Sequence, residues 1–464
     1  MNRLISLDIF RGMTIAFMIL VNNSGNWQTT YAPLEHAQWH GDTPTDWVFP
    51  FFLFIMGVAV PLALGKRLDQ GVERSVLTRK VLVRSGIIFG LGLFLAAYPR
   101  FGMAIDDPML WLQYLAVGLL ILLVFGREVL HQPQFAGEDN QRKRKWLGYA
   151  ALGIAGVMLI FGLFHYDLSR LRVPGVLQRI ALVYLACGLL YLRFSWKGLL
   201  ITGVVILLGY WAAMTLIPVP IDATLEAVLA SGDLSALAYS GAQEPLRQIS
   251  EHFVAPNLGA GGNIGAWFDR AVMHNHLYRS AENWDPEGLF STLPAVVTGL
   301  IGVLTGIWLR SQSDDYKKLT GILAVGTILL ALGLIWDVVF PINKKIWTSS
   351  YVLYVGGLAM LFLGVVYWLV DVLEYRGWTR PFVIFGMNPL FAYVLSGLIV
   401  KTAINIRWET EPGQMTNLWS WTYKHLFDPF LTTYNAAFAF ALANVLVCYL
   451  AVWALNRYKI FIRV

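Results

Sequence analysis

WVFPFFLFIMGVAVPLALG, residues 47–65, contains no charged side chain. A bilayer hydrocarbon core of about 30 Å is crossed by roughly 20 apolar residues in an α-helix. The strands of a membrane β-barrel are only about ten residues long and alternate in polarity. This stretch is twice that length and does not alternate, so it predicts a transmembrane helix.

Runs of the same kind recur along the whole chain. Of the 464 residues, 57% are hydrophobic and 14% are charged, whereas about a quarter are charged in soluble domains. We therefore predict an all-α, polytopic transmembrane helix bundle of about 12 helices, with 10 to 12 as the range. The predicted spans are near 10–22, 47–65, 83–98, 109–126, 147–164, 175–193, 198–217, 290–309, 320–340, 351–371, 382–401 and 433–455.

Basic residues in short loops favour the cytoplasmic side of a membrane and so indicate orientation. A cytoplasmic N-terminus places about 22 Lys and Arg on one side of the twelve spans and about 10 on the other. We therefore predict that both termini are cytoplasmic and that the first helix is retained. This topology accounts for the net charge of +6, so the charge gives no reason to predict nucleic-acid binding. The chain is predicted to form a single domain, 1–464, with outward loops at about 22–46, 218–289 and 402–432.

Polar side chains in or beside apolar spans are costly and suggest function. Asp8 and Arg11 open the first span at helical spacing, and Asn388 lies in the eleventh span near the cytoplasmic side. A local ion pair is the alternative for Asp8 and Arg11, and a contact between helices is the alternative for Arg179 and Asp337. The polar groups at the predicted outer depth are Asn22, Asp46, Arg179 and Asp337.

His36 lies between the first two spans, close in sequence to Asn22 and Asp46. Imidazole accepts or donates a proton near neutral pH. A carboxylate such as Asp46 can fix its tautomer, and an amide such as Asn22 can polarise a carbonyl group. These three residues are candidate catalytic groups, with a solvated or packing histidine as the alternative for His36.

The remaining histidines form weaker patterns. His40 lies close to His36 in sequence and is an alternative candidate for the same catalytic role. His274 and His276 could suggest a metal site together with Asp269. Because the two histidines lack a third firm ligand, we predict no metal site.

Several motifs occur in one order along nearly the entire chain and resemble the heparan-α-glucosaminide N-acetyltransferase family. Together they are more specific than any one tetrapeptide. They are RLISLDIFRG (3–12) with Val21-Asn22, HAQWHG (36–41) leading into TDWVFPFF (45–52), RVPGVLQR (172–179), DPEG (285–288), PINKKIW (341–347) and GMNP (386–389).

This resemblance implies a membrane-embedded acetyltransferase that takes acetyl-CoA from the cytoplasm and acetylates a terminal glucosamine on the far side. In that family the residues matching His36 and Asn22 are the proposed catalytic pair, and Asp46 would orient the imidazole. The candidate contacts for acetyl-CoA are Asp8, Arg11, Arg179 and Asn388. The candidate contacts for the sugar are Trp284, Asp285 and Glu287, for which a turn and helix cap is the alternative.

The resemblance also implies a multi-pass protein of a bacterial inner membrane. Its expected partners are acetyl-CoA as co-substrate, an amino sugar and membrane lipid. We expect no metal and no nucleic acid, and we leave open whether the protein forms a homodimer. One rival function is an amino-sugar (N-acetylglucosamine) transporter, although we find no repeat between the halves of the kind many transporters show. The second rival function is a polysaccharide O-acyltransferase. Such an enzyme would use the same histidine chemistry and would differ only in its product.

Overall fold

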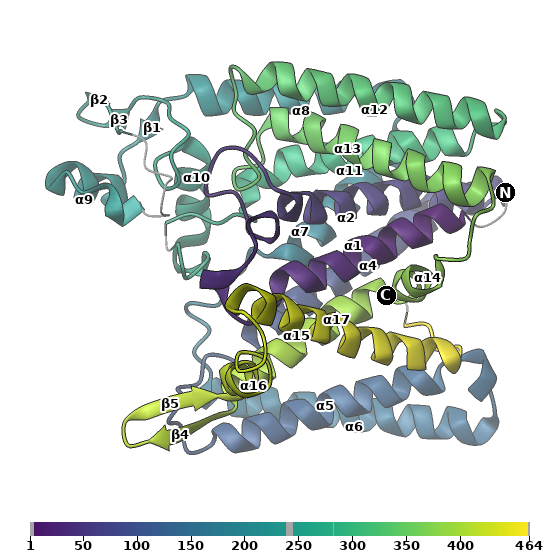
Figure 1. Cartoon of the computed structure of the whole chain (residues 1–464), viewed down its shortest axis with the longest axis vertical. Coiled ribbons are helices and arrows are strands. Elements are labelled where there is room, and N and C mark those ends of the chain that lie inside the picture. Colours follow the sequence, from purple (N-terminus) through teal and green to yellow (C-terminus); the bar gives the residue numbers. More distant parts are fainter. Residues whose placement is uncertain (1–3, 238–244, 282, 463–464) are drawn as a thin grey trace. The chain divides into compact units, whose positions relative to one another are not determined.

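The computed structural model describes residues 4–237, 245–281 and 283–462 and is mostly helical (Figure 1). Among these residues, eleven helices are long and apolar enough to cross a membrane, or twelve if one bent pair counts as a span. The prediction of a helical bundle with 10 to 12 spans is confirmed. The eleven are α1 (Ile5–Asn22), α2 with its continuation (Pro44–Asp69), α4 (Arg74–Ala97), α5 (Leu110–Leu130), α6 (Glu138–His165), α7 (Val176–Arg193), α8 (Trp196–Leu216), α11 (Leu289–Leu309), α12 (Asp315–Asp337), α13 with its continuation (Ser349–Val372) and α17 (Thr433–Arg457).

The eleventh predicted span is the bent pair. Helices α14 (Arg380–Met387) and α15 (Pro389–Asn405) meet at 83°. Proline has no backbone N–H to donate and disfavours a helical residue before it, so the helix breaks at Asn388. The buried Asn388 amide donates to the Ile460 carbonyl at 3.2 Å and accepts from the Ile462 N–H at 2.9 Å. Asn388 therefore lies at a corner and not, as predicted, within a continuous span.

The chain divides into two compact units. The larger contains Met1–Val21, Tyr31–Leu93 and Arg172–Val383, and the smaller contains Asn22–Thr30, Phe94–Leu171 and Ile384–Val464. The three long segments predicted outside the spans connect α1 to α2, α8 to α11, and α15 to α17. The side of the membrane on which they and the termini lie stays a prediction.

Helix α11 is the central helix of the larger unit, where it packs against α2, α7, α8 and α13. Its contact with α2 depends on glycine. A Cβ at Gly302 would lie 2.1 Å from the Phe54 carbonyl oxygen, and one at Gly57 would lie 2.0 Å from the Gly299 carbonyl oxygen. Small residues let membrane helices approach backbone to backbone. These glycines therefore hold α11 against α2, the helix whose first turn contains Asp46.

The segment between α8 and α11 folds at one end of these helices (Figure 1). It contains the strands β1 (Val219–Pro220), β2 (Gln248–Ser250) and β3 (Phe253–Val254), in the antiparallel order β1-β3-β2, and helices α9 (Ala223–Ser231) and α10 (Ile264–Met273). Its apolar core includes Trp39, Trp284 and Ile346. One hydrophobic cluster thus joins the loop before α2, the approach to α11 and the segment before α13.

The smaller unit contains the α5–α6 hairpin and a second group built on α15 and α17. The latter holds a hairpin of β4 (Arg407–Glu411) and β5 (Gln414–Asn417), followed by α16 (Leu418–Leu426). The rings of Trp419, Tyr423 and Phe427 pack edge-on against Phe440. These aromatic contacts hold α16 against α17.

Candidate functional site

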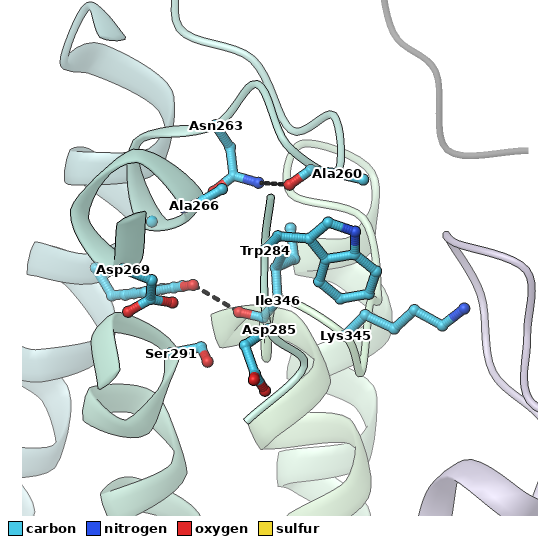
Figure 2. Close-up of a pocket in the computed structure, with 11 residues that line it drawn as sticks. Ala260, Asn263, Ala266, Asp269, Trp284, Asp285, Ser291, Lys345 and Ile346 are labelled. Atoms are coloured by element: carbon cyan, nitrogen blue, oxygen red, sulfur yellow. Dashed lines mark hydrogen bonds between the residues drawn. The ribbon is translucent and has the colours of Figure 1, made fainter. Parts of the chain in front are cut away.

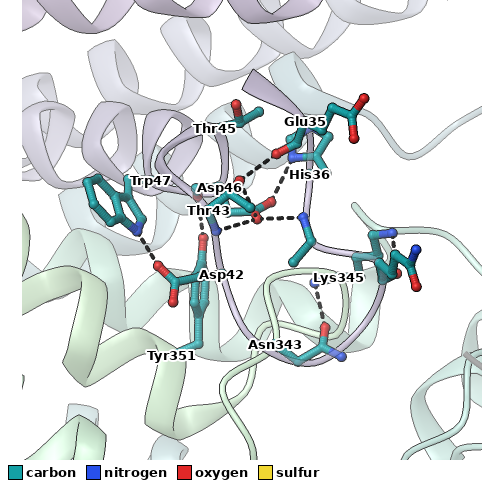
Figure 3. A network of polar contacts seen from close by, with 12 residues as sticks. Glu35, His36, Asp42, Thr43, Thr45, Asp46, Trp47, Asn343, Lys345 and Tyr351 are labelled. Atoms are coloured by element: carbon teal, nitrogen blue, oxygen red, sulfur yellow. Dashed lines mark hydrogen bonds and ion pairs between the residues drawn. The ribbon is translucent and has the colours of Figure 1, made fainter. Parts of the chain in front are cut away.

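His36 and Asp46 form a hydrogen-bonded pair (Figure 3). The His36 Nδ1 lies 2.6 Å from Asp46 Oδ1. The other carboxylate oxygen accepts the N–H groups of Ala37 at 3.0 Å and Thr43 at 3.1 Å. The Asp46 side chain is 1% exposed and the His36 side chain is 38% exposed. A carboxylate fixed by backbone donors thus orients an imidazole that faces outward.

The local sequence explains why Asp46 is so well fixed. Thr43 is the N-cap of α2, Pro44 occupies its first turn, and Asp46 is the third helical residue, which together make a capping box. A carboxylate at this position accepts backbone donors that the first helical turn leaves unsatisfied. The Tyr351 hydroxyl also donates to the Asp46 carbonyl at 2.6 Å. Asp46 therefore caps the helix and holds His36 with the same carboxylate.

A tight turn at residues 341–348 forms the facing wall of the site. Its organising residue is the fully buried Asn343, whose amide oxygen accepts the N–H groups of Lys345 at 2.8 Å and Ile346 at 3.1 Å. The Asn343 N–H donates to the Thr348 hydroxyl at 3.0 Å. The turn thus has a fixed shape made by its own side chains.

This turn is fastened to the loop that carries His36. The Gly41 N–H donates to the Ile342 carbonyl at 2.8 Å, and Gly41 pairs with Asn343 as an isolated β-bridge. The Lys345 ammonium donates to the Gln38 carbonyl at 2.7 Å. Residues about 300 positions apart in sequence thereby form one rigid polar surface.

The charges around His36 favour a neutral imidazole. The Lys344 charge is the largest influence that lowers the pKa of His36 below its usual 6.5, and burial and Lys345 act in the same direction against Asp46. A carboxylate can only accept, so Nδ1 carries the proton and Nε2 the lone pair. Among the described residues, no hydrogen bond to Nε2 is made. Its lone pair is therefore available to take a proton.

A small cavity lies beside this surface (Figure 2). Its volume is about 20 Å³, and Asp269, Trp284, Asp285 and Lys345 are among its lining residues. This is room for about one water molecule. Trp284 is 3% exposed and packs edge-on against Trp39 with ring centres 5.2 Å apart. The cavity therefore does not hold a sugar ring in this structure.

Asp269 contributes an unusual carboxyl group to the cavity wall. It accepts the Phe290 N–H at 3.1 Å at the start of α11. Burial is the main cause that raises its pKa to about 7, and the charge of Asp285 adds to the effect. Asp269 can therefore exchange a proton near neutral pH.

The motif that contains Asp285 and Glu287 is held by Arg172. The guanidinium donates to Asp285 at 2.9 and 2.6 Å and to Glu287 at 2.6 Å, and it lies 4.5 Å over the Tyr278 ring. Asp285 also accepts the Glu287 N–H at 2.9 Å. Burial alone would raise the pKa of Glu287, but the Arg172 charge and its neighbours lower it. The turn considered as the alternative is present, and sugar contacts by Trp284, Asp285 and Glu287 stay a prediction.

Arg179 is 1% exposed, near the start of α7. Its guanidinium donates to the Gly288 carbonyl at 3.0 Å and to the Ser291 hydroxyl, and it lies 5.0 Å over the Trp347 ring. Its Nε and Nη1 atoms make no hydrogen bond within the part of the chain that the structure describes. Arg179 thus ties α7 to α11, as in the alternative considered for it, and its contact with acetyl-CoA stays a prediction.

Residues 3–196 match a family model described as a domain of unknown function, DUF5009. The chain is 26% identical over 434 residues to heparan-alpha-glucosaminide N-acetyltransferase from Homo sapiens and 25% identical over 435 residues to that from Mus musculus. The chain is a distant homologue of these N-acetyltransferases. The human match covers 84% of this chain and 52% of the relative, and the mouse match covers 85% and 53%, so the chain spans about half the length of the curated relatives it matches.

The resemblance to the heparan-α-glucosaminide N-acetyltransferase family is thereby confirmed as distant homology. The roles of individual residues are not tested by it. Asp8 and Arg11 form the local ion pair considered above, at 3.4 Å. Asn22 is the exposed last residue of α1, and with Asn388 it belongs to the smaller unit. Their contacts with acetyl-CoA or with its carbonyl group stay predictions.

Sequence reasoning missed the lysines beside His36. Lys344 and Lys345 lie in the PINKKIW motif, which contributes to the resemblance but is not among the predicted site residues. Two adjacent cations between two apolar spans were a usable signal. Among the described residues no group of His, Cys, Asp or Glu could hold a metal ion, the His274 and His276 pair included.

Proposed function

We propose that this protein is a transmembrane acetyltransferase that moves an acetyl group from cytoplasmic acetyl-CoA to the amino group of a glucosamine-type sugar on the periplasmic side. The observation that carries the proposal is the outward-facing, neutral imidazole of His36, oriented by the buried Asp46. The names of the two distant relatives support an acetyl group as the group transferred and a glucosamine-type sugar as the acceptor.

The proposed reaction begins with a proton transfer. His36 Nε2 removes a proton from the acceptor nitrogen while the nitrogen lone pair forms a bond to the thioester carbonyl carbon. The carbonyl π pair moves onto oxygen, and the oxyanion then re-forms the carbonyl as the carbon–sulfur bond breaks. The thiolate takes the proton back from His36, which gives the amide and free CoA. Such general base catalysis contributes about 10²–10⁴-fold in rate.

Asp46 supports this chemistry in two ways. Its bond to Nδ1 selects the tautomer whose Nε2 has a lone pair. Its negative charge also stabilises the imidazolium that forms when Nε2 takes the proton. The backbone donors at Ala37 and Thr43 keep the carboxylate in place during this change.

The remaining parts of the proposal follow the resemblance. Residues 1–464 would act as one acyltransferase domain in a bacterial inner membrane, with both termini cytoplasmic. Asn22 would polarise the thioester carbonyl, and Asp8, Arg11, Arg179 and Asn388 would contact acetyl-CoA. Substitution of each contact residue by Ala is expected to raise the KM for acetyl-CoA more than that for the sugar.

A product assay tests the function. The purified protein is incubated with labelled acetyl-CoA and a panel of amino sugars, and we expect an N-acetylated sugar from the wild type. His36→Ala should lower kcat by at least about a hundredfold and still bind CoA. His252→Ala, which removes an exposed histidine of the larger unit, is the matched control and should match the wild type.

Three results would count against the proposal in different ways. Wild-type turnover in His36→Ala would remove His36 from the mechanism. An O-acetyl ester as product would identify an O-acyltransferase. Uptake of N-acetylglucosamine into proteoliposomes without acetyl-CoA, and no acetylated product, would identify a transporter.

A further inference from the structure

Lys344 presents a positive charge at the site that no described residue neutralises by direct contact. Its side chain is half-buried. Within residues 4–237, 245–281 and 283–462, the Lys344 ammonium makes no hydrogen bond and no ion pair within 4 Å. A lysine of this kind is usually paired or fully solvated, because an unpaired, half-buried charge loses part of its hydration.

The position of Lys344 is nevertheless well defined. Its neighbours Asn343 and Lys345 are buried and fixed to the loop that carries His36, through Gly41 and Gln38 respectively. The Lys344 charge acts on His36, Asp46 and Glu287. The turn therefore places Lys344 beside the loop that carries His36, close enough for its charge to act on the imidazole.

Lys345 is a poorer candidate for direct contact with a ligand. It is 6% exposed, and its ammonium already donates to the Gln38 carbonyl at 2.7 Å. Its role is to fasten the turn, and it adds to the positive potential at His36. Lys344 is the more exposed of the two.

A cation beside a general base disfavours protonation of that base. The cation can still assist the reaction if a negative charge forms next to it in the same step. As His36 takes a proton, its imidazolium is repelled by the Lys344 charge. The same ammonium would attract an oxyanion formed next to the ring. A charge that develops only in the transition state is where fixed donors contribute most to rate.

We propose that Lys344 is a further catalytic residue, whose ammonium holds the oxyanion that forms on the thioester carbonyl oxygen. This inference rests on the proposed acetyl transfer. When the acceptor nitrogen bonds to the carbonyl carbon, the π pair moves to the oxygen, and Lys344 donates a hydrogen bond to that oxygen without giving up its proton. When the carbon–sulfur bond breaks, the electron pair returns from oxygen to form the amide carbonyl, and Lys344 is released unchanged.

The test compares the plateau of kcat, at a pH where His36 is neutral, in four purified full-length proteins. They are the wild type, Lys344→Met, Lys344→Arg and Lys317→Met, the last as an exposed control in the larger unit. Loss of one oxyanion donor typically lowers kcat about 10²–10³-fold. We expect a loss of about that size in Lys344→Met, partial rescue in Lys344→Arg and no change in Lys317→Met.

The pH profile separates this role from electrostatic tuning alone. Removing the Lys344 charge raises the pKa of His36, so the acidic limb of kcat against pH moves to higher pH in Lys344→Met. If Lys344 only tunes His36, the limb moves while the plateau stays at the wild-type value, and the inference is overturned although the proposed function stands. If the wild type forms no N-acetyl product, the proposed function fails instead.

Folding is checked by thermal unfolding in detergent and by CoA binding, with Lys344→Gln as a second neutral variant. A side chain without protein partners is not needed for the fold. Both neutral variants should therefore unfold near the wild-type temperature. If neither folds, Lys344 has a structural role and the inference is wrong.

Discussion

Two polar clusters of the larger unit are built from similar residues and have opposite properties. In the Arg172 cluster, the guanidinium binds both Asp285 and Glu287, and both carboxylates are buried. In the His36 cluster, Asp46 is bound on all sides, but His36 is 38% exposed and Lys344 has no direct partner among the described residues.

The difference indicates where chemistry is to be expected. A buried polar network that satisfies all its members rigidifies a structure. A network with an outward lone pair and an unpaired cation retains groups that a substrate can engage. The Arg172 cluster thus explains how the approach to α11 is held, and the His36 cluster explains how an acyl group could be transferred.

Among variants that test this difference between the two clusters, we expect the largest loss of kcat from Asp46→Asn. The amide can still cap α2 in part, but it no longer selects the His36 tautomer or stabilises the imidazolium. Loss of the carboxylate from a comparable triad lowers kcat about 10⁴-fold, so we expect a loss of about a thousandfold or more. The measurement is kcat alongside thermal unfolding, and a loss below about tenfold would show that Asp46 serves mainly as a helix cap.

A smaller effect, on stability and not on catalysis, is expected from Arg172→Met. Breaking a buried ion pair by removal of one partner costs about 3–5 kcal/mol, because charges are left buried and unpaired. We expect a lower unfolding temperature in detergent for Arg172→Met and no change for Arg170→Met, which removes an exposed arginine and serves as the control. A raised KM for the sugar without loss of stability would show instead that Asp285 and Glu287 bind substrate.

The helices and the His36 pair could be predicted from the sequence because both are local. Length and apolar composition define a span, and Thr43 and Asp46 at N-cap spacing bring the carboxylate back toward His36. The break at Asn388 was also encoded locally, in the proline that follows it, but an apolar run of sufficient length concealed it.

The rest depended on packing over long sequence separations. Lys344 and Lys345 are about 300 residues from His36, and only the turn organised by Asn343 places them beside it. Arg172 and Asp285 were both recognised within motifs, but their spacing of 113 residues gives no indication that they pair. Contacts of this kind follow from the tertiary fold and not from periodicity.

The most direct test of the central claim is the dependence of kcat/KM on pH for acetyl transfer, measured in the wild type and in His36→Ala. The pKa of His36 is lowered, so activity should be retained down to a pH below 6.5 and then fall as the imidazole becomes protonated and loses its lone pair. That acidic limb should disappear in His36→Ala along with most of the activity. A limb at or above pH 6.5, or one that His36→Ala leaves in place, would contradict the assignment of His36 as the neutral general base.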